Sequence, residues 1–132
     1  MKKILMTVVL LSSMAFASYT KEDRIADMQA MAGAMADLQR GFLYNNNEII
    51  QAGAKVLRDH ALTLQPPRMG DKSLSRDQHY AFMFARKQQR KIDQHAAQLA
   101  EKFANGDKYQ AVHHFTKILK QCTACHTKLR KW

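Results

Sequence analysis

The sequence predicts an all-α fold, an antiparallel bundle of four helices. Apolar residues recur at three- and four-residue spacing in four separate segments, as they do on the buried face of an amphipathic helix. Asn, Pro, Gly and capping residues separate these segments. No segment has the strict apolar–polar alternation of a half-buried strand. Two short links and one longer one would join the four helices.

The first helix is expected to begin near Thr20, which forms a capping-box pattern with Asp23. The tripeptide 45–47 (Asn-Asn-Asn) supplies a turn and N-caps for the second helix. Pro66 and Pro67 should end that second helix. The expected core positions of these two helices are Ile25, Met28, Met31, Ala32, Met35, Leu38, Phe42, Ile49, Ile50, Gly53, Val56, Leu57, Ala61 and Leu64.

A longer loop leads to the third helix, which Ser75 should cap. Asn105 and Gly106 are expected to end the third helix, and Asp107 to cap the fourth. The expected core positions of these two helices are Tyr80, Met83, Phe84, Ile92, Leu99, Phe103, Val112, Phe115, Leu119, Cys122, His126 and Leu129.

The first seventeen residues have the three regions of a secretory signal peptide. Two lysines follow Met1, an apolar stretch covers residues 4–11, and Ala15-Phe16-Ala17 forms a small-x-small cleavage site. The apolar stretch is shorter than the ~20 residues that span a bilayer. We therefore expect cleavage after Ala17, export to the periplasm, and one domain over residues 18–132 without a transmembrane segment. The alternative is a buried N-terminal helix.

The chain is basic, with 21 Lys and Arg against 11 Asp and Glu and a formal net charge of +10. A basic surface attracts acidic partners and speeds their encounter. Charges of both signs are scattered along the chain, and an exported protein seldom meets nucleic acid. The charge therefore favours periplasmic or membrane-bound redox proteins with acidic surfaces, or an anionic membrane surface, over nucleic acid.

The most specific motif is Cys122-Thr-Ala-Cys125-His126, the C-x-x-C-H attachment signature of a c-type haem. The two thiols would bind one haem covalently, and His126 would bind its iron. Two alternatives need no haem. A zinc site would require a fourth ligand, such as His113 or His114. A thiol-redox motif normally stands at a helix start after a strand, whereas this motif lies near the end of a helix.

On a helix, Cys122 and His126 share one face because they are four residues apart. Only six residues follow His126, and none is Met or His, so a sixth iron ligand is expected upstream. Met28 and Met35 are seven apart and face the same way, with Met31 about 60° away. The alternative for these three methionines is that they only pack in the apolar core.

The chain resembles the cytochrome c′ family. The resemblance rests on the four-helix pattern, the length, the C-x-x-C-H motif near the C-terminus, and Arg130, which follows His126 by four residues. The resemblance covers the mature chain and extends to the spacing of Arg24, Met28 and Met35. It implies a four-helix bundle with one haem c bound through Cys122 and Cys125, with His126 as the proximal ligand. The sequence departs from the family at Gly33-Ala34-Met35, where many relatives have Gly-x-His before a Met.

The resemblance also implies that Met28 faces the sixth iron position, giving a low-spin electron carrier rather than an enzyme. Arg24 and Arg130 would pair with a haem propionate or tune His126; a solvated helix face is the alternative for both. Relatives with an apolar distal residue have five-coordinate iron and bind nitric oxide or carbon monoxide. A histidine sixth ligand would come from His60, and a homodimer would be compatible with this class.

Overall fold

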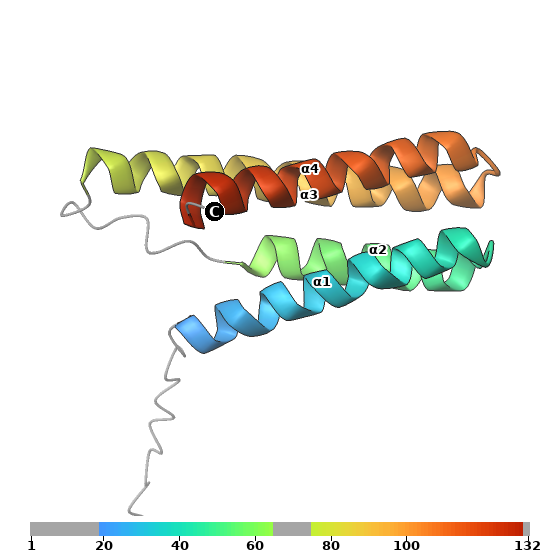
Figure 1. The fold of residues 1–132 in the computed structure, drawn as a ribbon, viewed down its shortest axis with the longest axis horizontal. Coiled ribbons are helices and arrows are strands. Elements are labelled where there is room, and N and C mark those ends of the chain that lie inside the picture. Colours follow the sequence, from blue (N-terminus) through green and yellow to red (C-terminus); the bar gives the residue numbers. More distant parts are fainter. Residues whose placement is uncertain (1–18, 65–74, 131–132) are drawn as a thin grey trace, which may run out of the picture.

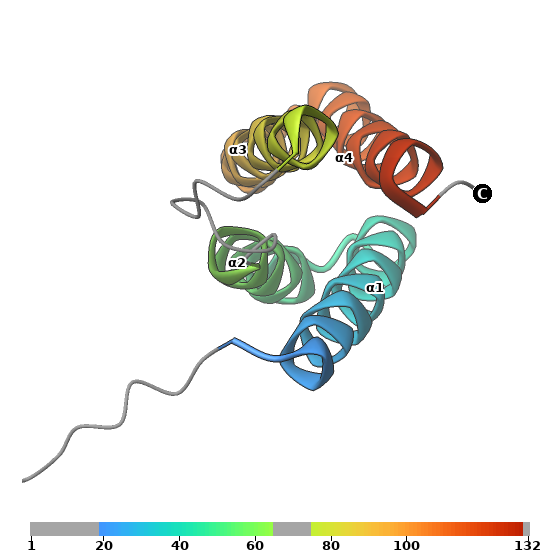
Figure 2. The ribbon, with the colours of Figure 1, turned by 90° about the vertical axis from the view of Figure 1, so that its left-hand side faces the viewer.

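The computed structural model describes residues 19–64 and 75–130. These residues form four helices and no strand: α1 (Lys21–Leu43), α2 (Asn47–Thr63), α3 (Arg76–Ala104) and α4 (Lys108–Arg130). Successive helices run antiparallel, with α1 and α2 on one side of the molecule and α3 and α4 on the other (Figures 1 and 2). The all-α, four-helix part of the prediction is confirmed. The expected signal segment 1–17 and the Pro66–Pro67 helix stop lie outside the described residues.

The predicted helix caps are confirmed. The Asp23 N–H donates to Thr20 Oγ1 at 3.1 Å and the Thr20 N–H donates to Asp23 Oδ2 at 2.7 Å, which completes a capping box. Asn46, Ser75 and Asp107 each accept the backbone N–H three residues on, at 3.1, 3.3 and 3.1 Å. These side chains satisfy amides that a helix start leaves without partners.

The helices pack in chain order, α1 on α2, α2 on α3 and α3 on α4. A single apolar core fills the bundle, and its largest fully buried members are Leu38, Ile50, Leu57, Leu99, Phe103 and Ile118. Gly53 permits a close approach of α2 to α1. A Cβ at this position would lie 3.1 Å from Leu38 Cγ and 3.2 Å from the Ala34 carbonyl oxygen.

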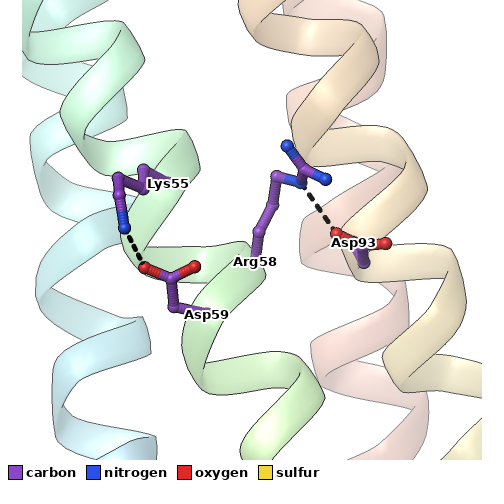
Figure 3. A network of polar contacts seen from close by, with 4 residues as sticks. All are labelled: Lys55, Arg58, Asp59 and Asp93. Atoms are coloured by element: carbon purple, nitrogen blue, oxygen red, sulfur yellow. Dashed lines mark hydrogen bonds and ion pairs between the residues drawn. The ribbon is translucent and has the colours of Figure 1, made fainter.

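Polar contacts on the outer surface join α2 to α3. The Arg58 guanidinium donates to Asp93 Oδ1 at 2.8 Å across the two helices, and Lys55 pairs with Asp59 within α2 (Figure 3). Exposed pairs of this kind contribute about 0–1 kcal/mol. The core rather than these pairs therefore determines how the helices pack.

The predicted buried faces of α3 and α4 are partly wrong. Tyr80, Met83, Val112, Leu119 and Leu129 are exposed, as is Ile25 of α1, while Phe82, Ala111 and Ile118 are buried. Val112 and Leu119 each follow a buried residue by one position, which rotates them about 100° away from the core. The buried faces of α3 and α4 contain alanines and glutamines. The prediction followed the larger apolar residues beside them and therefore placed the buried face wrongly.

None of the helices in the described ranges is both long enough and apolar enough to cross a membrane.

Candidate functional site

The start of α1 and the end of α4 lie at the same end of the bundle (Figure 1). Residues of both helices line a cavity of about 340 Å³. This volume is within the ~300–1,000 Å³ range of ligand and cofactor pockets. Its wall is mostly apolar. Residues of α1, α3 and α4 form it, together with Leu64, which directly follows α2. The lining residues are Met28, Met31, Ala32, Met35, Leu64, Ala85, Gln88, Gln89, Ile92, Leu119, Cys122, Thr123, Cys125 and His126.

The three residues of the C-x-x-C-H motif form the α4 wall of this cavity. Cys122, Cys125 and His126 are each half-buried, and no disulfide joins the two cysteines. The motif is helical throughout, so positions 122 and 126 follow one another along one face. Cys122 also packs against the core. Two thiols and an imidazole are thus brought to one apolar cavity.

Burial, and to a smaller extent the nearby Cys125, raises the pKa of the Cys122 thiol to about 11. A thiol with this pKa is almost entirely protonated at pH 7. Cysteines that work in disulfide exchange have pKa values lowered to about 3.5–7.5. The surroundings of Cys122 are therefore the opposite of those that a thiol-redox motif requires.

The three candidate methionines form the α1 part of the wall. Met31 is 6% exposed, whereas Met28 and Met35 are half-buried, and all three line the cavity. The thioether of each methionine is a soft ligand that suits haem iron. The structure thus brings together the α4 motif and every methionine that the sequence suggested, across almost a hundred residues of chain.

Helix α3 supplies a part of the wall of which the sequence analysis identified only Ile92 as a buried position. Ala85, Gln88, Gln89 and Ile92 recur at three- and four-residue spacing, and Leu64 adjoins them. The Gln89 amide donates to the Leu64 carbonyl oxygen, which fixes the chain just after α2. The three- and four-residue spacing of these residues could have indicated a buried helix face. Two of the four are glutamines, which are usually exposed, so the pattern was not recognised as buried.

The two candidate arginines are not placed in the cavity wall. Arg24 is half-buried on α1, one turn before Met28, and is absent from the lining. Arg130 is the last residue of α4, and its side chain lies outside the described part of the structure. Their proposed roles toward a haem remain predictions.

The other candidate histidines make contacts elsewhere. His60 Nδ1 lies 2.7 Å from Asp27 Oδ1, and the Tyr19 hydroxyl donates to the other oxygen of that buried carboxylate. His60 is not among the residues that line the cavity. His114 lies against His95 of α3, with 3.2 Å between their Nδ1 atoms. Within residues 19–64 and 75–130, no three His, Cys, Asp or Glu side chains gather closely enough to hold a metal ion.

The donor set and the wall together fit a c-type haem. Cys122 and Cys125 offer the two thiols that thioether attachment would use, and His126 and a methionine could act as ligands to its iron. The remaining wall is mostly apolar, which suits a macrocycle and would limit the access of water to its iron. No family model, curated protein or solved structure matches this chain.

Proposed function

We propose that this chain is a periplasmic c-type cytochrome of the four-helix-bundle kind that carries electrons through one haem. Cys122 and Cys125 hold the haem covalently, His126 is the proximal iron ligand and Met28 the distal one. One observation supports this proposal above the others. The C-x-x-C-H motif of α4 and the methionines of α1 line the same cavity.

The bound haem would supply a one-electron Fe(II)/Fe(III) couple. The protein would supply the rest: His126 and a thioether fix the coordination, and the apolar residues exclude water. A thioether ligand raises the potential relative to two imidazoles. Since neither ligand needs to leave, the site suits electron transfer without a chemical reaction on a substrate.

Three methionines in the wall favour this function over five-coordinate gas binding, which requires a distal side chain that cannot bind iron. The raised pKa of Cys122 argues against a thiol-redox module. The pairing of His114 with His95 takes one of the suggested zinc ligands into a separate contact.

Haem attachment can be tested by producing the full chain in a bacterium with a c-type cytochrome maturation system. We expect the purified protein to retain its haem absorption after denaturation and acid–acetone extraction, because the attachment is covalent. The double variant Cys122→Ala/Cys125→Ala should lose the haem under the same extraction. A wild-type polypeptide whose mass equals that of the chain alone would refute the proposal.

A further inference from the structure

The net positive charge of the four helices lies on one side of the bundle. Helix α3 has six basic and three acidic residues, and α4 has five basic residues and no acidic one. Helices α1 and α2 together have five basic and six acidic residues. Because α3 and α4 form one side of the molecule (Figure 2), the protein is electrically polar across its width.

Two hollows mark the outer surface of this basic side. The first has a volume of about 510 Å³ and is lined by Tyr80, Met83, Phe84, Arg86, Lys87, Arg90, Lys91 and Gln94. The second has a volume of about 650 Å³ and is lined by Phe84, Thr116, Leu119, Lys120, Thr123, Ala124, Thr127 and Lys128. Phe84 belongs to both, and neither lining includes an acidic residue. We call the two hollows together the basic face.

The basic face has an apolar centre. Tyr80 is 56% exposed, Met83 47% and Leu119 51%, and the rings of Tyr80 and Phe84 stack with centroids 6.4 Å apart. Lys128 Nζ lies 5.4 Å from the Tyr80 ring centroid. Apolar and aromatic residues surrounded by a charged rim are the usual anatomy of a protein–protein interface.

The basic face also adjoins the cavity. Leu119 and Thr123 line both the second hollow and the cavity that holds the C-x-x-C-H motif. The same stretch of α4 therefore separates the cavity from the outer surface. A protein bound at this face would come as close to the cavity as the α4 wall allows.

We propose that the basic face is the docking site for an acidic electron-transfer protein; this inference rests on the proposed function. Complementary charge would steer the encounter and orient the partner, while the small apolar centre would leave the complex weak enough to dissociate rapidly. A membrane surface fits less well. Binding in the interface plane uses one helix with a continuous apolar face, whereas here the apolar residues are spread over two helices and flanked by basic ones.

The test uses reduced plant-type ferredoxin, a small acidic redox protein with a potential of about −400 mV. The rate of haem reduction is measured by stopped flow at increasing ionic strength. Lys120→Glu/Lys128→Glu changes the basic face, and Lys21→Glu/Lys55→Glu makes the same change of net charge on α1 and α2. We expect the first variant to react about 10-fold more slowly at low salt and the second less than about 2-fold more slowly. The difference should vanish near 1 M salt, where charges are screened beyond about 3 Å. Equal slowing of the two variants would overturn the proposal.

A second measurement separates this proposal from the proposed function. Amide chemical shifts of the ¹⁵N-labelled full chain are followed as ferredoxin is added, and this readout needs no electron transfer. Shifts confined to the basic face without haem reduction would support docking and refute the electron carrier. Normal reduction with shifts on α1 and α2 instead would support the carrier and overturn the docking site. Binding to vesicles of phosphatidylglycerol and phosphatidylcholine that depends on Lys120 and Lys128, without ferredoxin-induced shifts, would assign the face to a membrane.

Discussion

At the scale of single residues, the sequence motif and the cavity point to the same three residues of α4. They leave open which methionine of α1 is the second iron ligand. Cys122, Cys125 and His126 could be proposed as haem-binding residues from the sequence alone, because they form one local motif. The α1 ligand could not, since Met28, Met31 and Met35 all reach the wall. Of the α3 wall only Ile92 was predicted to be buried, because the rest depends on how α3 packs against its neighbours.

The choice among the methionines gives a direct prediction. We expect Met28→Ala to convert the low-spin haem spectrum to a high-spin one and to lower the reduction potential, since the thioether that favours the ferrous state is lost. Met31→Ala and Met35→Ala serve as matched controls, and both should retain the low-spin bands. Optical spectra and voltammetry of the three variants provide the measurement. A low-spin Met28→Ala protein beside a high-spin Met35→Ala protein would transfer the role to Met35.

At the scale of helices, local signals were predicted well and buried faces less well. Thr20, Asn46, Ser75 and Asp107 could be identified as caps because a cap depends only on the next few residues. The core face of α3 depends on its neighbours, and its buried Gln88 and Gln89 resemble surface residues in sequence. Hydrophobicity alone therefore pointed to Tyr80 and Met83.

The α1–α2 contact predicts opposite effects for two glycines. Gly53→Ala should destabilise the fold by about 1–3 kcal/mol, because its Cβ would press on Leu38 and on the backbone of Ala34. Gly33→Ala should stabilise by up to about 1 kcal/mol, since nothing lies within 4 Å of its Cβ and alanine favours the helix. Urea unfolding measures both. A stabilising Gly53→Ala would contradict the close packing of these helices.

The α3–α4 contact predicts a pH dependence. Burial lowers the pKa of both His95 and His114. The positive charges of Lys117 and Lys91 also lower the pKa of His95, and His95 also lowers the pKa of His114. The folded state thus holds fewer protons than the unfolded one. Stability from this pair is full above the ordinary histidine pKa of about 6.5 and is lost as the pH falls below it.

His95→Gln/His114→Gln should therefore reduce the loss of stability between pH 8 and pH 5. The urea midpoint of each protein at the two pH values is the measurement, with His79→Gln, at an exposed position of α3, as the control. An unchanged pH dependence in the double variant would contradict a contribution from this pair.

At the scale of the whole molecule, the helices pack in chain order, and the cavity lies between the first helix and the last. A haem in that cavity would close the bundle by linking α1 to α4. We expect the haem-free chain to exchange amide hydrogens fastest near residues 28–35 and 119–126, because these stretches lose the packing that the haem provides. Hydrogen exchange of the wild type and of Cys122→Ala/Cys125→Ala, after removal of its non-covalently held haem, compares the two forms. Equal protection of these stretches in both forms would argue against the haem as the link.

We propose that the cavity lined by α1 and α4 holds one haem, with His126 and Met28 as the iron ligands. The optical spectrum of the purified wild-type protein, oxidised and then reduced, tests it most directly. We expect sharp ferrous α and β bands and the weak long-wavelength ferric band of iron–thioether ligation, unchanged by carbon monoxide. Broad high-spin bands that shift with carbon monoxide, or no haem absorption at all, would contradict the claim.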